Sequence, residues 1–294
     1  MRNYFALIWV VILILSSGCG KKGVDPVEDA TDVDAVANIV LFDYGHLFLP
    51  DSLATPIPDT LPLELASPYK LEKFWRTVEL DSLILMIGEQ DTIIEDSVRI
   101  VPIRGVTVAR HMRGKLEIMA TDTSDGESRT VRMSKPYFTS GSVNGTVKKY
   151  GFDYNTRRGW LLTDIGNARY SYGDRVVHIC SSSHPEDTIT PGLGTYPFSL
   201  FPVFSNGESL TVLVENLLPS DTIGAVSIKC PTSDGLVWRQ LQKNESGTFI
   251  GGFRFYDFIY DKHIYIDLIR SRTFERDTSS YHSSAIGVSY NVRQ

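Results

Sequence analysis

From about residue 70 to the C-terminus, apolar residues recur at every second position, in runs bounded by Gly, Pro, Asn, Asp and Ser. Leu210, Val212 and Val214 form one such series, and a second runs from Ile264 to Leu268. A period of two is that of a β-strand with one buried face, because successive side chains point to opposite faces. The pattern predicts a mainly β protein.

The same alternation predicts long antiparallel strands between residues 71 and 172. The segments are Phe74–Ile87, Asp96–Ala120, Ser128–Met133, Ser142–Phe152 and Gly159–Tyr172. Asp125 and Gly126 lie within Thr123–Ser128, where Gly126 supplies the positive-φ position of a hairpin turn. The small residues of Thr139–Gly145 predict a loop.

Upstream of these strands, apolar residues recur at three- and four-residue spacing, which predicts an amphipathic helix of about four turns. The apolar positions are Val33, Val36, Ala37, Val40, Leu41, Tyr44 and Leu47. Thr31 or Asp32 is placed to cap the first turn. Five prolines lie between Pro50 and Pro68, so an irregular connection is predicted there.

One helix followed by long antiparallel strands, the last beginning at Arg158-Gly159-Trp160, resembles the cystatin-like or nuclear-transport-factor-2-like layout. The resemblance is one of element order. It implies an α+β domain, with one helix on an antiparallel sheet, over residues 31–172. Sheets of that kind can curl around an apolar pocket. The resemblance therefore also implies an alternative function, a small-ligand-binding or enzymatic N-terminal domain.

Residues 173–294 contain no helical pattern and about seven strand-like runs, at spacings typical of an Ig-like β-sandwich. Asn244–Phe253 resembles the turn and strand of bacterial Ig-like surface modules, although the Cys…Trp…Cys pattern of antibody domains is missing. The interpretation is therefore of two domains, with an Ig-like sandwich over residues 173–294.

The N-terminal apolar run, Tyr4–Leu15, has 12 residues, whereas a helix needs about 20 residues to cross a bilayer. It follows Arg2 and precedes small residues, which is the order of a secretory signal peptide. Ser17-Gly18-Cys19 resembles the lipobox of bacterial lipoproteins. That resemblance implies that residues 1–18 are removed and that Cys19 is acylated, and acyl chains would hold the protein on a membrane.

Two alternatives remain for the N-terminus: an uncleaved anchor, and a plain secretory signal with an incidental Cys19. Residues 19–30 are acidic and nearly free of bulky apolar side chains, which predicts a flexible tether. The chain resembles uncharacterised bacterial lipoproteins with a C-terminal Ig-like domain. This implies a location in the bacterial cell envelope, at the outer membrane or cell surface, with the membrane as a partner through lipid.

Composition narrows the class of protein further. A hydrophobic content of 42% and an aromatic content of 11% are enough to fill a globular core. The net charge of −6, without a Lys/Arg cluster, argues against a nucleic-acid partner. Cys180 and Cys230 both share strand faces with apolar residues, which favours two separate thiols, although export would permit a disulfide.

Motifs that would reveal catalysis are missing from the sequence. The six histidines are scattered singly, and we find neither a nucleophile elbow nor a phosphate-binding loop. Two metal sites are weaker alternatives, because an ordinary turn explains each segment better. One is a calcium site at Asp122, Asp125 and Glu127, and the other is a metal site at His178, Cys180 and His184. We therefore expect no enzyme activity, no metal and no cofactor.

The most distinctive segment is Phe253–Ile266, in which aromatic residues are dense. Alternation sends only every second side chain inward, so Tyr256, Phe258 and Tyr260 are predicted to form an interaction surface for an envelope protein partner. The alternative is that they are buried between the domains. The resulting hypothesis is a lipid-anchored cell-envelope protein that acts through binding or structural contacts.

Overall fold

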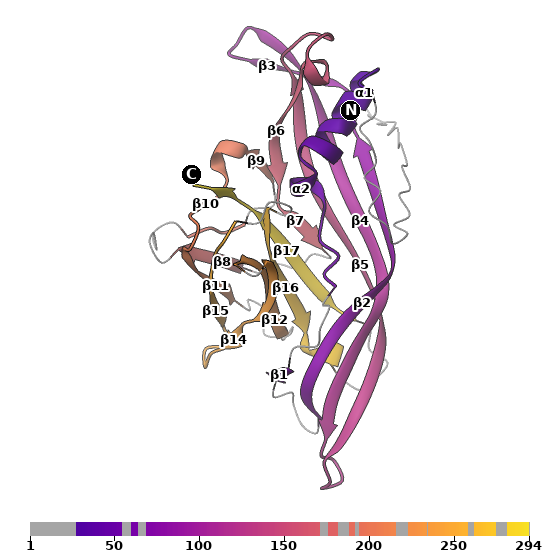
Figure 1. The fold of residues 1–294 in the computed structure, drawn as a ribbon, viewed down its shortest axis with the longest axis vertical. Coiled ribbons are helices and arrows are strands. Elements are labelled where there is room, and N and C mark those ends of the chain that lie inside the picture. Colours follow the sequence, from indigo (N-terminus) through magenta and orange to yellow (C-terminus); the bar gives the residue numbers. More distant parts are fainter. Residues whose placement is uncertain are drawn as a thin grey trace, which may run out of the picture.

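The computed structural model describes residues 28–54, 60–63, 69–170, 176–181, 188–191, 194–215, 223–233, 235–257, 262–274 and 281–293. The protein is mainly β, and nearly all of its strand pairs are antiparallel (Figure 1). A short helical segment at the N-terminal end packs beside the longest strands. The predicted fold class is therefore confirmed at this level.

The N-terminal helical segment consists of α1 (Asp32–Asn38), a π-helix (Ile39–Asp43) and α2 (Gly45–Phe48). Thr31 is the N-cap, because its hydroxyl accepts the Asp34 N–H while the Asp34 carboxylate accepts the Thr31 N–H. This reciprocal capping box satisfies two amides that the helix leaves unpaired. The predicted helix and its Thr31 cap are confirmed.

Three strands of unusual length build the rest of the N-terminal half: β2 (Tyr69–Ile87), β4 (Arg99–Asp122) and β5 (Arg129–Lys149). The shorter strands are β1 (Thr60–Leu63), β3 (Asp91–Glu95), β6 (Trp160–Gly166) and β7 (Ala168–Tyr170). A 3₁₀ turn, η2 (Thr156–Gly159), precedes β6. Gly126 has a φ of +79° between β4 and β5, as the hairpin prediction requires.

The predicted loop at Thr139–Gly145 is wrong, because β5 runs straight through it. Tyr137, Thr139 and Val143 are buried along one face of this strand, so the alternation continues where the sequence is rich in small residues. Gly141 is small for a packing reason. A Cβ atom there would lie 2.3 Å from the ring of Tyr170.

The C-terminal half consists of short strands, two of which, β9 and β10, occupy residues 195–204, where the sequence suggests a single strand. They are β8 (Val176–Ser181), β9 (Thr195–Pro197), β10 (Val203–Phe204), β11 (Ser209–Glu215), β12 (Ile223–Thr232), β13 (Gly235–Gln240), β14 (Gln242–Lys243), β15 (Phe249–Arg254), β16 (His263–Arg270), β17 (Ser283–Ser289) and β18 (Asn291–Val292). Short 3₁₀ turns, η3 (Phe198–Leu200) and η4 (Ser271–Phe274), join some of them.

The strands of both halves form one large sheet. Its order is β1-β2-β4-β5-β7-β17-β16-β12-β13, and β7 pairs with β17 across the predicted boundary at residue 172. A smaller sheet, β14-β15-β11-β8, lies beside the C-terminal strands. The hydrogen-bonded sheet is thus continuous across residue 172. The division of the chain into two folding units stays a prediction.

Strand β16 lies between two apolar clusters, and both of its faces are buried. Ile264, Ile266 and Leu268 belong to a cluster shared with the smaller sheet. Tyr265 and Ile269 point the other way, into a cluster with the long strands and the helix. The central strand of the C-terminal half therefore contributes to the core of the N-terminal half.

The two described cysteines are free thiols on different sheets, as the face argument predicts. Cys180 lies on β8 and is half-buried, with its sulfur 3.5 Å from the Thr188 hydroxyl. Cys230 lies on β12 and is fully buried, and this burial raises the pKa of its thiol to about 12.

Candidate functional site

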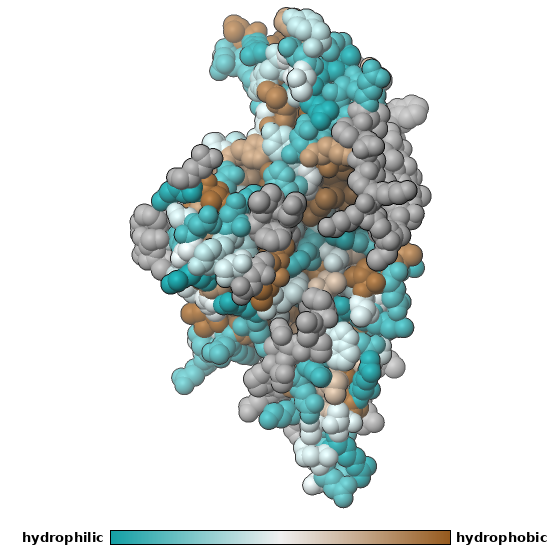
Figure 2. Space-filling view, in the orientation of Figure 1, coloured by the Kyte–Doolittle hydropathy of each residue, from teal (hydrophilic) through white to brown (hydrophobic). Residues whose placement is uncertain are grey.

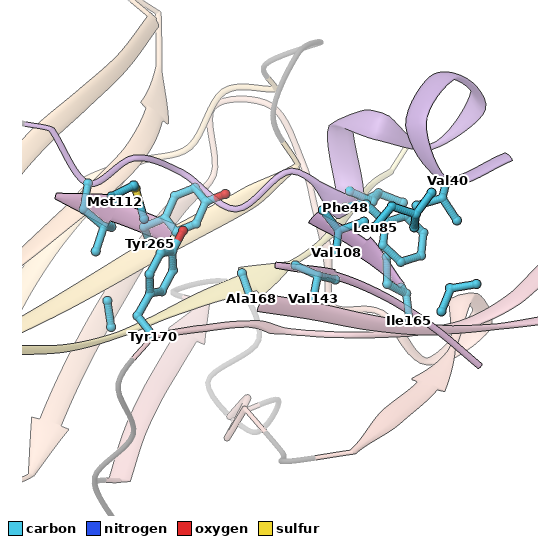
Figure 3. Close-up of a cluster of buried hydrophobic side chains, with 14 of the residues drawn as sticks. Val40, Phe48, Leu85, Val108, Met112, Val143, Ile165, Ala168, Tyr170 and Tyr265 are labelled. Atoms are coloured by element: carbon cyan, nitrogen blue, oxygen red, sulfur yellow. The ribbon is translucent and has the colours of Figure 1, made fainter. Parts of the chain in front are cut away.

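The inner face of the long sheet is the place where a ligand pocket would form, and side chains fill it. Val40 and Phe48 from the helical segment pack against Leu85, Val108 and strands further along the sheet (Figure 3). Tyr170 and Tyr265 meet edge to face, with ring centres 6.3 Å apart, at the other end of this cluster.

The irregular segment from Pro50 to Ala54 closes the same face. Its backbone carbonyls accept hydrogen bonds from side chains of four strands: Arg110 to Pro50 (2.7 Å), Tyr170 to Asp51 (2.8 Å), Tyr137 to Ser52 (3.1 Å) and Trp238 to Ala54 (3.2 Å). Leu53 is fully buried, and its φ of +52° shows that the segment is held in a demanding conformation. Among the described residues, this segment therefore covers part of the inner face and is bonded to four of its strands.

A buried ion pair joins the two halves inside this core. Arg76 on β2 donates to Asp267 on β16, and both side chains are fully buried. Arg76 also donates to the Tyr281 hydroxyl at 2.8 Å and lies 5.8 Å from the ring centre of Trp238. Strands nearly 200 residues apart in the chain are thus linked by charge as well as by packing.

Burial and charge act in opposite directions on this pair. Burial lowers the pKa of Arg76, but the electrostatic effects of Asp267, Tyr281 and Tyr137 and the hydrogen bond to Asp267 together outweigh it, so the pKa lies above its ordinary value. Burial raises the pKa of Asp267, and Arg76 only partly opposes that rise. The arrangement holds a cation in the core and offers no substrate access, so we assign it a structural role.

A polar pocket of about 400 Å³ lies beside the segment predicted to bind partners. Its lining includes His46, Asn206, Asp257, Lys262, Tyr290 and Arg293. Lys262 pairs with Asp257, and its ammonium group lies 5.7 Å from the ring centre of Tyr290. Among the described lining residues, Asp257 is the acidic side chain and is already paired, and Arg293 is a second basic side chain at the rim.

The structure brings only part of the predicted interaction surface into view. Tyr256 is half-buried next to Asp257, and its N–H donates to the Pro231 carbonyl at 3.1 Å. Phe258 and Tyr260 lie outside the described residues, as does Cys19. The neighbouring Phe253 and Phe255 are buried. Part of the aromatic segment is therefore core, as alternation requires.

At the two metal sites considered from the sequence, the described candidate ligands do not converge on a common point. Asp125 and Glu127 both pair with Arg129, at 3.9 Å and 3.0 Å. Asp122 instead accepts the Ser124 N–H at 2.9 Å. His178 contacts Thr190, and His184 lies outside the described part of the chain. Within that part, no three His, Cys, Asp or Glu side chains gather as a metal site.

A network of ion pairs ties α1 to the β5–β6 connection. Asp32 accepts from Lys149 at 3.0 Å and from Arg158 at 2.8 Å, and both bases also pair with Asp153. Burial alone raises the pKa of Asp32, but the hydrogen bonds from Arg158 and Lys149 lower it below its ordinary value of 3.8. The charged form of Asp32 therefore stabilises this end of the fold.

We expect acid to remove the contribution of Asp32 to stability. Because its folded-state pKa is depressed, the contribution is present above its unfolded pKa and is lost as pH falls through the folded value. An Asp32→Asn variant should therefore be less stable than the parent at neutral pH and similar to it at an acidic pH below the folded-state pKa. Urea unfolding at the two pH values measures the difference. Glu79→Gln is the control, since Glu79 and Lys115 form a pair in which both side chains are 55% exposed. An Asp32→Asn deficit that persists in acid would contradict the assignment.

Comparison with known proteins finds no match: no family model, no curated protein and no solved structure matches the chain. In the described part of the chain, none of the helices is long and apolar enough to cross a membrane.

Proposed function

We propose that this protein is a lipid-anchored component of the bacterial cell envelope that acts through binding contacts and not through catalysis. Anchoring is inferred from Tyr4–Leu15 and the following Ser17-Gly18-Cys19. The observation that carries the contact function is the packing of the helical segment and Pro50–Ala54 against the inner face of the long sheet, where, among the described residues, they occupy space that a ligand would need.

The rival function, a small-ligand-binding or enzymatic N-terminal domain, lacks this support. It requires an open concave face with inward acids or histidines. In the part of the chain that the structure describes, the fully buried acid Asp267 is paired with Arg76, and the buried His263 packs against Tyr265. The described polar pocket lies elsewhere, between α2, β18 and Asp257.

The Ig-like assignment of residues 173–294 belongs to the same proposal. A shared apolar cluster between β8, β11 and β15 on one side and β12 and β16 on the other supports it. Sandwich modules of this type present loops and edges to partners. We place the partner contact at Tyr256, Phe258 and Tyr260.

The test follows the protein in a bacterial envelope and has two readouts. Mass spectrometry should find an acylated Cys19 as the first residue, with residues 1–18 removed, and a Cys19→Ser variant should lose both features. Crosslinking should then recover an envelope partner from the parent protein, and replacement of Tyr256, Phe258 and Tyr260 by Ser should reduce that recovery without a change in the thermal transition.

Two results would contradict the proposal. An unmodified Cys19 or a retained Met1 would remove the anchor. A folded triple variant that keeps every crosslink would show that the aromatic segment is not the contact surface.

A further inference from the structure

Exposed apolar side chains gather at the end of the molecule where the described chain begins. Ile94, Val98 and Ile100 on the β3–β4 hairpin are 71%, 85% and 70% exposed. Phe152 and Tyr154 on the β5–β6 connection are 68% and 83% exposed. Figure 2 shows hydrophobic residues in brown at this end, above the body of the molecule. We call these five residues the apolar end.

Polar contacts on the inner side hold the two parts of the apolar end together. Arg99 donates to the Tyr150 carbonyl at 3.3 Å, and the Tyr150 hydroxyl donates to Glu95 at 3.0 Å. Ile94 and Ile100 are direct partners in the β3–β4 ladder, one position away from the Glu95–Arg99 pair. Alternation therefore turns these isoleucines away from the body of the protein.

The aromatic part of the apolar end is preformed. Phe152 and Tyr154 stack with ring centres 5.4 Å apart and an interplanar angle of 14°. The Phe152 N–H donates to the Asn155 side chain at 2.7 Å, which fixes the start of the loop. A surface that is already ordered loses little conformational entropy when it binds.

The apolar end also lies where the proposed anchor enters the fold. Glu28 is the first described residue, and Asp32 in α1 is bonded to the loop that carries Phe152 (Figure 1). Glu28 lies nine positions after Cys19, and a chain of that length reaches at most about 30 Å. Strand β4 alone has 24 residues and extends up to about 80 Å. A lipid on Cys19 would thus hold this end nearest the bilayer.

We propose that the apolar end inserts into the interfacial region of a lipid bilayer and orients the protein on it. The proposal rests on the anchored location proposed above. Aliphatic and aromatic side chains are suited to this interface, where apolar area is buried and a tyrosine hydroxyl stays hydrated. The bases nearby include Lys148, Lys149 and Arg158, which are paired with acids, and Arg99, which is the ladder partner of Glu95. Binding therefore depends on apolar contact and changes little with salt or anionic lipid.

Cosedimentation with vesicles tests this surface without the acyl group. The chain from residue 20 to residue 294 contains every described residue and is mixed with vesicles of phosphatidylethanolamine and phosphatidylglycerol. We expect measurable binding by the parent, and a loss of about tenfold or more in the partition coefficient for Phe152→Ser/Tyr154→Ser and for Ile94→Ser/Val98→Ser/Ile100→Ser.

The matched control is Leu80→Ser/Phe138→Ser, since both residues are apolar and 58% exposed on the long strands. It should bind as the parent does. Absence of binding by the parent, equal binding by the apolar-end variants, or an equal loss in the control would each overturn the proposal. An unmodified Cys19 in cells together with selective loss of vesicle binding would reject the anchor and leave the apolar end as a membrane contact.

Discussion

Replacement of Arg76 by Met is expected to destabilise the protein by about 3–5 kcal/mol, because it leaves the carboxylate of Asp267 buried without its cation. Both side chains are fully buried, Arg76 bonds to Oδ2 of Asp267, and Oδ1 of Asp267 has no hydrogen-bond partner among the described residues. Urea unfolding measures the loss. Since β2 and β16 belong to different halves, the transition should also become less cooperative.

A double variant separates the ion pair from simple packing. Arg76→Met/Asp267→Leu removes both charges, so it should be more stable than Arg76→Met alone, as buried pairs replaced by apolar residues often are. Lys115→Met is the control, because its pair with Glu79 is exposed and screened by solvent, so the pair contributes little to stability. If Arg76→Met costs no more than Lys115→Met, the pair does not join the halves.

The ion pair also shows what the sequence could have revealed. Arg76 shares a strand face with Phe74 and Val78, and Asp267 shares one with Tyr265 and Ile269. A single charge of each sign on two otherwise apolar faces is a signal for a buried pair. The sequence does not say that the two faces meet, because that depends on how the sheet curls over nearly 200 residues.

Local features were predictable because local chemistry determines them. The Thr31 cap, the period of the long strands and the turn at Gly126 each depend on residues within a few positions. The pairing of β7 with β17 is different, since an edge strand can accept many partners and only the packed core selects one. For the same reason, the two-domain interpretation could not foresee a continuous sheet.

The apolar end was missed for a related reason. Ile93, Ile94, Ile100 and Val101 look alike in the sequence, and each could occupy a core-facing position. Val101 is buried while Ile94 and Ile100 are mostly exposed, because the hairpin extends beyond the strands that would have covered its outer face. The exposure of Ile94 and Ile100 therefore depends on where the strands next to the β3–β4 hairpin end.

Replacement of Gly114 by alanine is the second substitution expected to destabilise the protein strongly, and it tests the packing of the long sheet. On β4, Gly114 pairs with Val78 at the point where the register of β2 shifts between Val78 and Leu80. A Cβ atom at position 114 would lie 1.8 Å from the Thr77 carbonyl oxygen, which is part of the backbone and cannot rotate away. Gly114→Ala should therefore force the strands apart and cost about 3 kcal/mol or more.

Gly105 on the same strand provides the matched control, because a Cβ atom there meets nothing within 4 Å. Gly105→Ala should leave the urea midpoint unchanged or raise it slightly, since alanine restricts the unfolded chain more than glycine does. Hydrogen exchange should show lost protection in Gly114→Ala that is concentrated in β2 and β4. If both variants unfold at the same urea concentration, the bulge in β2 adapts to a side chain, and the close approach of β2 to β4 at this point is not required for the fold.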